Sequence, residues 1–180
     1  MAQHDPNPEH VVLVNEWDEE LGLMEKLEAH RTGALHRAFS IFLFDKQGRL
    51  LLQQRALGKY HSAGLWTNTC CSHPRSGEDL LAAAHRRLKE EMGLTAELEH
   101  RFSFIYRGEV GDGLWEHELD HVFTGLLKEV PVPDPAEVMD FRWVEPEQLA
   151  KDLATDPKTY TIWLRKCWPQ VAGSLHATRA

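Results

Sequence analysis

The segment from Gly77 to Gly93 constrains the fold most, because both ends of a helix and its buried face can be read from its residues. Asp79 is a suitable N-cap, since its carboxylate can accept hydrogen bonds from the free amides of the first turn. Gly93 is typical of the position just after a helix. Apolar side chains recur at helical spacing at Leu80, Leu81, Ala84, Leu88 and Met92. The pattern predicts an amphipathic helix with charged residues on its outer face.

Short apolar segments on both sides of this helix predict strands. They cover residues 10–14, 38–44, 50–52, 102–107, 116–127 and 141–144. Residues 45–48 provide the turn of a β-hairpin, and a glycine-rich turn is predicted over residues 108–113. Further helices are predicted from Pro146 and over residues 159–168, the latter ended by Pro169. Strands and helices without βαβ alternation favour an α+β fold or a three-layer sandwich.

Composition indicates one domain. The chain has 180 residues, of which 42% are hydrophobic, enough for a single core. We expect a flexible N-terminal tail over residues 1–9 and one domain over residues 10–180. The formal charge of −8 argues against a nucleic-acid or membrane-surface partner, whose affinity depends on a basic patch. No apolar stretch approaches the ~20 residues that span a bilayer. Three cysteines are too few for a disulfide framework, which predicts a reducing, cytoplasmic location.

Two adjacent cysteines precede a histidine in the segment Cys70-Cys71-Ser72-His73. This places a thiol close to a potential metal ligand just ahead of the predicted helix. A non-catalytic zinc module is one interpretation of such a cluster. Adjacent cysteines lack the Cys-x-x-Cys spacing of structural zinc sites, so this interpretation is weak.

Glu116 and Glu118 alternate within a predicted strand, so their carboxylates share one face of the sheet. Two neighbouring carboxylates repel each other unless a cation lies between them or one holds a proton. His117 and His121 would share the opposite face. Spacing alone leaves open which of the two faces holds a metal, or whether the glutamates are an exposed acidic edge.

The region from Ser72 to Leu94 resembles the Nudix box, a helix whose glutamates hold the metal in pyrophosphate hydrolases. Glu78 and the run from Arg86 to Leu94 match that pattern. The box has Glu directly after its Arg, where this chain has Arg87. A metal ligand is thereby replaced by a cation. The resemblance implies an α/β/α sandwich with a mixed sheet. The loss of one metal-binding glutamate weakens the prediction of pyrophosphate hydrolysis.

Five further motifs occur in order along the chain. They are Leu35-His36-Arg37-Ala38-Phe39-Ser40 preceded by Ala29-His30, Gln54-Arg55-Ala56-Leu57 followed by Lys59, Gly64-Leu65-Trp66-Thr67-Asn68, Cys71-Ser72-His73-Pro74, and Trp115-Glu116-His117-Glu118. Together they closely resemble type I isopentenyl-diphosphate delta-isomerase, a member of the Nudix superfamily. The resemblance runs from about Val11 to Trp168.

This resemblance implies a set of site residues. The catalytic cysteine of the family falls on Cys71, which leaves Cys70 at a variable position. The acid–base and aromatic residues of the site correspond to Glu118, Tyr106 and Trp163. Positions around the substrate diphosphate correspond to Lys26, Arg55, Lys59 and Arg87.

The resemblance also implies two metals. One divalent ion, Mn²⁺ or Mg²⁺ with Zn²⁺ as a further candidate, is expected at a site of three histidines and two glutamates. These are His30, His36, His73, Glu116 and Glu118. A second ion, Mg²⁺ held by Glu91, would bridge the diphosphate. The implied partner is a small allylic or homoallylic diphosphate, and we expect a monomer or weak dimer.

The implied reaction interconverts isopentenyl and dimethylallyl diphosphate, in isoprenoid biosynthesis. It moves a double bond by adding one proton and removing another, through a tertiary carbocation. Such a shift needs two acid–base groups on opposite faces of the substrate, for which Cys71 and Glu118 are the natural pair. Trp163, with Trp66 as a further candidate, would face the carbocation. The alternative function is a Nudix pyrophosphohydrolase acting on a nucleoside diphosphate derivative, which Arg87 disfavours.

Overall fold

One mixed sheet joins the nine strands formed by the described residues. The computed structural model describes residues 9–177, so of the predicted tail only Glu9 is placed and the rest lies outside the described residues. The strands are β1 (His10–Val14), β2 (Glu20–Glu25), β3 (His36–Phe44), β4 (Leu50–Arg55), β5 (Trp66–Thr67), β6 (Cys70–Ser72), β7 (Glu99–Gly111), β8 (Leu114–Leu126) and β9 (Val138–Val144).

The sheet is organised around β3. This strand runs parallel to β8, with His36 opposite Glu118 and Phe44 opposite Leu126. Its other edge pairs in turn with β1, β6 and β4. Beyond β8 lies β7, and β4 continues to β5 and β9. Because β6 and β8 flank β3, the cysteine segment and the Glu116–Glu118 segment are brought to either side of the same strand.

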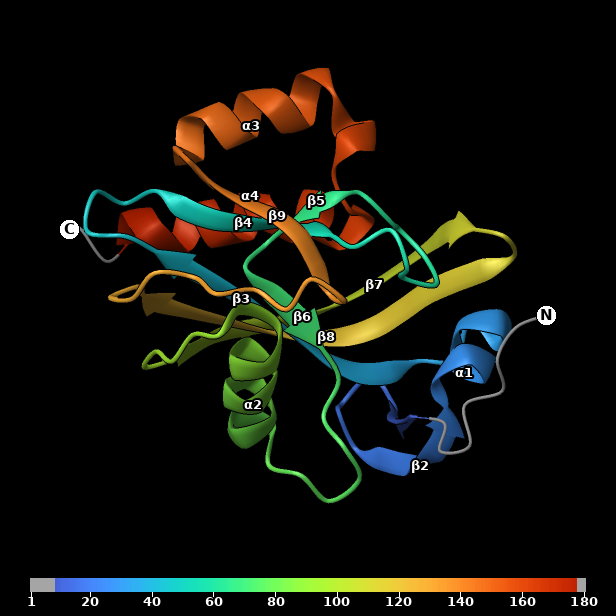
Figure 1. Ribbon diagram of the computed structural model, residues 1–180. Coiled ribbons are helices and arrows are strands. Elements are labelled where there is room, and N and C mark those ends of the chain that lie inside the picture. Colours follow the sequence, from blue (N-terminus) through green and yellow to red (C-terminus); the bar gives the residue numbers. More distant parts are fainter. Residues whose placement is uncertain (1–8, 178–180) are drawn as a thin grey trace.

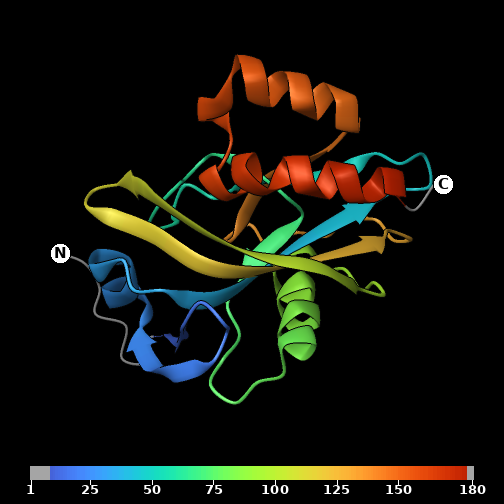
Figure 2. The same ribbon diagram turned by 180° about the vertical axis from the view of Figure 1, so that it is seen from behind.

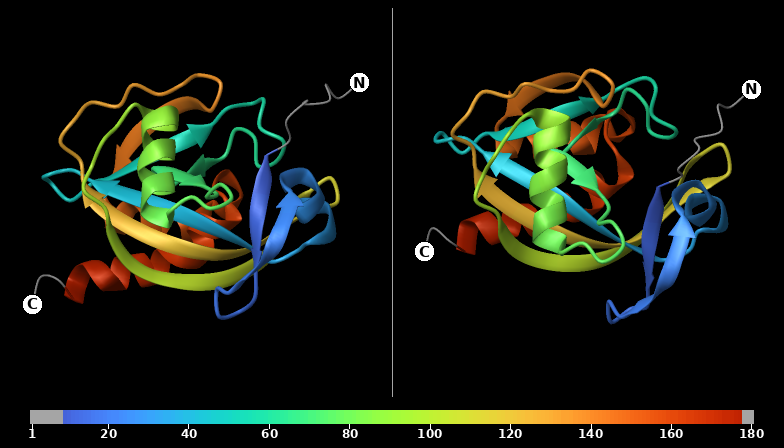
Figure 3. Two further views of the ribbon diagram at one scale, coloured as in Figure 1. Left: turned by 90° about the horizontal axis from the view of Figure 1, so that it is seen from below. Right: turned by 60° about the horizontal axis from the view of Figure 1, so that its bottom comes forward.

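Helices cover both faces of this sheet (Figure 1). They are α1 (Lys26–Thr32), α2 (Leu80–Met92), α3 (Pro146–Thr155) and α4 (Ile162–Ala177), with a 3₁₀ turn at Pro157–Thr159. Figure 3 shows α2 crossing one face, with α4 on the far side. Strand β3 explains the layering, because its side chains alternate: Phe39 and Ile41 pack on the α2 side, and Phe42 and Phe44 on the α4 side. The predicted α/β/α sandwich with a mixed sheet is confirmed.

The predicted central helix forms where its caps indicate. Helix α2 begins after Asp79, whose carboxylate accepts the amide of Ala82 at 3.0 Å. It ends at Gly93, which is left-handed with φ +66°. The carbonyl of Val132, in the Pro-rich loop, packs directly against this glycine, and a Cβ there would lie 2.6 Å from the carbonyl oxygen.

We therefore expect Gly93→Ala to lower the free energy of unfolding by about 2–4 kcal/mol. A side chain in the left-handed region costs ~1–2 kcal/mol, and crowding against backbone adds to it. Gly77→Ala is the matched control, because Gly77 has φ +70° but nothing lies within 4 Å of its Cβ position. Urea denaturation of both variants measures the difference. Equal losses would show that the contact with Val132 carries no cost.

The hairpin of β7 and β8 is longer than predicted (Figure 2). The prediction of a turn over residues 108–113 is wrong, since only Asp112 and Gly113 lie outside the two strands. Both have positive φ, 53° and 72°, as the tight Asp-Gly hairpin turn requires. Gly108 stays in the strand because Ile162 at the start of α4 fills the space where its side chain would be.

The prediction that Pro169 ends the last helix is also wrong. Helix α4 starts at Ile162, not Thr159, and continues through Pro169 to Ala177. Proline removes one backbone hydrogen bond and tends to kink a helix. Here Trp168 before it and Val171 after it are buried in the same apolar cluster. Packing on both sides of the proline keeps the helix on the sheet.

The segment after β1 leads into two elements that were not predicted, β2 and α1. Glu25 caps α1 by accepting the amides of Leu27 and Glu28. The predicted strands around residues 10–14, 38–44, 50–52 and 141–144 and the helix from Pro146 are present. Across residues 9–177, every helix is too short or too polar to traverse a bilayer.

Candidate active site

A cavity of about 70 Å³ opens beside β3, between β6 and β8. The sequence-predicted residues that line it come from seven elements and two loops. They are Lys26, Arg55, Lys59, Cys71, His73, Arg87, Glu91, Tyr106, Glu116, Glu118 and Trp163. His30 and His36 are fully buried next to it, in contact with Glu116 and Glu118 respectively. All the predicted site residues are thus brought to one place.

Four of the predicted metal ligands converge. Potential ligand atoms of His30, His36, His73 and Glu118 all lie within 4.8 Å of one another. Glu116 falls in a second group of the same tightness, with His30 and with His61. The face of β8 that carries Glu116 and Glu118 is therefore the one that lies against His30, His36 and His73. His117 and His121 point elsewhere, to the carbonyl of Gly33 and to Asp18.

Backbone carbonyls fix how two of the imidazoles point. Nδ1 of His30 lies 2.7 Å from the carbonyl oxygen of Lys26, and Nδ1 of His36 lies 2.8 Å from that of Ala34. A carbonyl only accepts, so each Nδ1 carries the proton, and each Nε2 faces the centre. Metal-binding histidines are held by their second nitrogen in this way.

The buried nitrogen of His36 indicates a cation site. Its Nε2 has no hydrogen-bond partner, yet lies 3.4 Å from a carboxylate oxygen of Glu118. Two acceptors so close together repel unless a proton or a metal ion lies between them. The chemistry of the donor set, imidazole plus carboxylate, suits Mn²⁺, Fe²⁺ or Zn²⁺. The residues fit a divalent transition metal.

Both glutamates are ionised despite their burial. Burial raises the pKa of Glu116, but the nearby imidazole of His30 and the hydrogen bond from His61 outweigh it and hold the pKa well below its usual value. Burial and the charge of Glu116 raise the pKa of Glu118, and the imidazoles of His36 and His73 offset them, so its pKa is also lowered. Burial lowers the pKa of His73 to about 4 although Glu118 opposes it, so this ring is neutral.

The thiol and the phenol of the site retain their protons. Burial raises the pKa of the Cys71 thiol, and Arg55 lowers it by less. Burial and the two glutamates raise the pKa of Tyr106 well above its usual value. The Tyr106 hydroxyl donates to Glu118 at 2.7 Å. A protonated thiol and an ionised carboxylate therefore share one cavity.

Four cations line this cavity, and three of them pair with carboxylates. Lys26 pairs with Glu9, and Lys59 donates to Glu137 at 2.6 Å. Arg87 donates to Glu91 at 2.6 Å and lies 3.5 Å from Glu137. The Nε atoms of Arg55 and Arg87 are buried without a hydrogen-bond partner, so each guanidinium keeps a donor to offer.

Glu91 is held from several sides. The Gln53 amide donates to one of its oxygens at 3.0 Å, and Arg87 binds the other. The thiol of Cys70 is fully buried and lies 3.4 Å from Glu91. Cys70 therefore points away from Cys71, into the core beneath α2.

Only one of the two candidate tryptophans lies in the cavity. Trp163 lines it, with the Arg55 guanidinium 5.2 Å from its ring centre. Trp66 packs instead against the α4 side of the core, with Arg142 at 4.4 Å from its ring. Trp66 is not among the residues that line the cavity, so the fold does not bring its ring to the position predicted for a contact with the carbocation.

Sequence reasoning missed five residues that line this site, Glu9, Tyr60, His61, Ser72 and Glu137. His61 binds Glu116 at 2.8 Å, the Tyr60 hydroxyl lies 3.2 Å from His30, and Glu137 binds Lys59. Tyr60 and His61 lie in a loop between Gly58 and Gly64, two glycines that mark a turn. Their position directly after Lys59 and shortly before the Trp-Thr-Asn motif was the available signal.

The outer face of α2 carries a separate ion pair that stabilises the fold. Arg86 binds Glu78 through two hydrogen bonds, at 2.6 and 2.9 Å. The hydrogen bonds from Arg86 lower the pKa of Glu78 to about 2. A folded-state pKa below the ordinary 4.5 means that this stabilisation is complete above pH 4.5 and is lost as the pH falls toward 2.

We expect Glu78→Gln to destabilise the protein by roughly 1–3 kcal/mol at pH 7, with the difference from wild type narrowing below about pH 4.5. Glu90→Gln is the control, because Glu90 touches the same guanidinium at 3.2 Å from a more exposed position. It should cost less than about 1 kcal/mol. Urea unfolding across pH measures both. A pH-independent loss in Glu78→Gln would contradict the ionic origin of its contribution.

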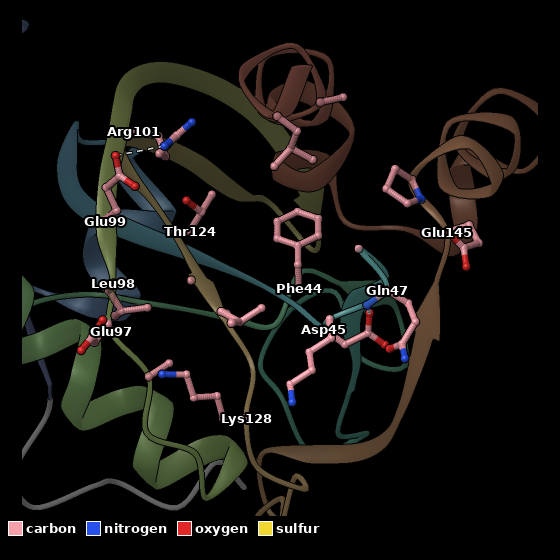
Figure 4. Close-up of a pocket in the computed structure, with 18 of the residues that line it drawn as sticks. Phe44, Asp45, Gln47, Glu97, Leu98, Glu99, Arg101, Thr124, Lys128 and Glu145 are labelled. Carbon is pink, nitrogen blue, oxygen red and sulfur yellow. Dashed lines mark hydrogen bonds and ion pairs between the residues drawn. The ribbon is translucent and has the colours of Figure 1, made fainter. Parts of the chain in front are cut away.

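A larger hollow, of about 1570 Å³, lies at the other end of the sheet (Figure 4). Phe44 and Leu98 form part of its floor, and charged residues such as Lys128 and Glu97 surround them. None of the predicted site residues is among those that line it. Size alone would favour this hollow as the active site, but the predicted catalytic and metal-binding residues line the smaller cavity.

Comparison with known proteins identifies the family of this chain. The NUDIX domain family matches residues 34–164. Isopentenyl-diphosphate Delta-isomerase 2 of Aromatoleum aromaticum is 53% identical over 91% of this chain and 86% of its own length. The isopentenyl-diphosphate Delta-isomerase of Serratia proteamaculans is 52% identical over 86% and 87%. That of Burkholderia multivorans is 48% identical over 92% and 93%.

Solved structures show the same fold at lower identity. A crystal structure from Deinococcus radiodurans superposes with a TM-score of 0.76 and 21% identity, covering 90% of this chain and 98% of that one. A Nudix hydrolase from M. smegmatis superposes with a TM-score of 0.58 and 19% identity, covering 92% and 94%. The family match and the close relatives together show that this chain belongs to the Nudix superfamily and, within it, to the isopentenyl-diphosphate Delta-isomerase family.

Proposed function

We propose that this protein interconverts isopentenyl diphosphate and dimethylallyl diphosphate. The observation that carries this proposal is the pairing of the protonated Cys71 thiol with the ionised Glu118 carboxylate, on strands that flank β3 and in one cavity. Environments that push two pKa values apart identify an acid and a base. An alkene shift needs both at once.

The protonation states of Cys71 and Glu118 assign the roles of acid and base. Starting from isopentenyl diphosphate, the Cys71 thiol gives its proton to the terminal CH₂ carbon, and the double-bond electrons form the new C–H bond. The tertiary carbocation then loses a proton from C2 to Glu118, and the C–H electrons form the new double bond. The step leaves a thiolate and a carboxylic acid, so one proton must return to the sulfur through water before the next turnover. Tyr106, which donates to Glu118, orients the carboxylate.

Trp163 and Arg55 are suited to bind the two charged parts of the substrate, the carbocation and the diphosphate. The Trp163 indole lines the cavity and offers its face to a carbocation, a contact worth about 2 kcal/mol when water is excluded. The Arg55 guanidinium already lies 5.2 Å from the centre of this ring. A guanidinium so placed is suited to the diphosphate end of the substrate, because its planar donors match phosphate oxygens.

The diphosphate anchors the substrate without reacting, so that its binding energy positions the alkene. We infer that the diphosphate replaces the carboxylates of Glu9 and Glu137 as the partner of Lys26 and Lys59. Exchange of one anion for another keeps each ammonium paired throughout.

The metal would be held by His30, His36, His73, Glu116 and Glu118. We infer that Mn²⁺ or Mg²⁺ occupies this site, and that Mg²⁺ at Glu91 bridges the diphosphate. A divalent ion bound there would neutralise the two carboxylates and set the proton affinity of Glu118. The three free cysteines support a reducing, cytoplasmic setting, and the product class supports a role in isoprenoid biosynthesis.

The test is incubation of the purified protein with isopentenyl diphosphate, Mg²⁺ and Mn²⁺ in deuterated water. We expect dimethylallyl diphosphate that carries deuterium, detected by NMR, and no turnover after removal of divalent ions with EDTA. Release of phosphate without a rearranged alkene would overturn the proposal in favour of a pyrophosphohydrolase. The replacement of a box glutamate by Arg87 already disfavours that outcome.

A further inference from the structure

His61 lies at the centre of the site although no motif singled it out. Its side chain is 4% exposed and belongs to the loop between β4 and β5. The imidazole contacts Glu116 at 2.8 Å and packs edge-on against Trp163, with ring centres 5.9 Å apart. Arg55 donates to its backbone carbonyl at 3.1 Å. One residue thus touches a predicted metal ligand, the predicted carbocation contact and a predicted diphosphate contact.

The hydrogen bonds of His61 determine which nitrogen carries its proton. Nε2 faces Oε1 of Glu116, and a carboxylate can only accept, so Nε2 is the donor. Nδ1 lies 3.0 Å from the Ser62 hydroxyl, which can donate to it. Such an imidazole has no lone pair directed at Glu116 or at the ion beyond it. His61 therefore differs from His30 and His36, whose Nδ1 atoms donate to backbone carbonyls and whose Nε2 atoms face the centre.

The bond from His61 decides where Glu116 lies. Four ligand atoms, from His30, His36, His73 and Glu118, form one group within 4.8 Å, and Glu116 lies outside it, in a group with His30 and His61. One oxygen of Glu116 is taken by His61, while the other lies 3.4 Å from the Tyr106 hydroxyl. Without His61, the first oxygen of this buried carboxylate would keep only the longer contact to His30, at 3.5 Å.

We propose that His61 is a positioning residue for the metal site, which holds one oxygen of Glu116 so that the carboxylate joins the metal ligands through the other. This inference rests on the metal site of the proposed function and adds a residue outside the five implied ligands. Partners that hold a metal ligand in place usually contribute 10–100-fold to metal affinity. The same bond keeps the loop that carries Lys59 and Tyr60 closed on β8.

The test measures Mn²⁺ binding directly, by the EPR signal of free Mn²⁺ during titration of the metal-free protein. We expect His61→Ala to weaken Mn²⁺ binding about 10–100-fold. His61→Gln should restore affinity to within about threefold of wild type, because its amide N–H can donate to Glu116 as Nε2 does. His85→Ala, which removes an exposed histidine on α2, is the control and should bind as wild type does. The Mn²⁺-induced rise in Tm of each variant gives a second readout and shows that each is folded.

Two outcomes would overturn the inference. Equal Mn²⁺ affinity in His61→Ala and wild type would show that Glu116 needs no support. Affinity in His61→Gln as weak as in His61→Ala would show that the imidazole lone pair itself binds the ion. Failure of the proposed function would give a different result. If wild type and the variants show the expected order of Mn²⁺ affinities but the wild-type protein does not isomerise isopentenyl diphosphate, only the proposed activity is refuted.

Discussion

Cys71→Ala should lower kcat for isomerisation by about 10³-fold or more, since a positioned proton donor contributes ~10²–10⁴. The physical reason is that burial keeps this thiol protonated, so that it is an acid poised on the β6 side of the cavity. No other thiol can substitute, because Cys70 and Cys167 are fully buried in the core. Deuterium incorporation from heavy water, followed by NMR, gives the rate.

Cys70→Ala is the matched control for this experiment. Its thiol is adjacent in sequence but points beneath α2, where it contacts Glu91 at 3.4 Å. We expect turnover within a few-fold of wild type and a loss of stability of about 1 kcal/mol, from the small cavity and the weak hydrogen bond. Thermal unfolding of both variants separates stability from chemistry. Comparable losses of turnover in the two variants would refute the assignment of the thiol.

Glu118→Gln should be the most damaging change that preserves shape. The amide cannot accept the proton that leaves C2, which alone costs about 10²–10⁴ in kcat. It also withdraws a charged ligand from the group that includes His36 and His73, so Mn²⁺ affinity should fall by at least ~10-fold. Turnover measured at saturating Mn²⁺ isolates the first effect from the second.

The same hairpin provides a control for Glu118. Glu109→Gln removes an exposed carboxylate from β7 and should leave both turnover and Mn²⁺ affinity unchanged. If Glu118→Gln regains wild-type turnover once Mn²⁺ is saturating, the carboxylate acts only as a ligand.

Local chemistry was enough to predict the central helix and the face of the glutamates. Asp79 and Gly93 act on backbone groups within one turn, so the ends of α2 follow from the sequence. Glu116 and Glu118 share a face because strand side chains alternate with a period of two. The ordered motifs identified the family and, through it, most of the residues that the fold brings together.

The folded structure decided what depends on residues distant in the chain. Helix α4 passes Pro169 because Trp168 and Val171 are both buried on the sheet, and β7 extends through Gly108 because Ile162 packs over it. His61 reaches Glu116, 55 positions later in the chain, only because the loop after β4 folds back over β8. Capping and periodicity are properties of neighbouring residues. The position of His61, the proton on its Nε2 and the carboxylate partners of Lys26 and Lys59 arise from contacts between residues far apart in the chain, which exist only in the folded protein.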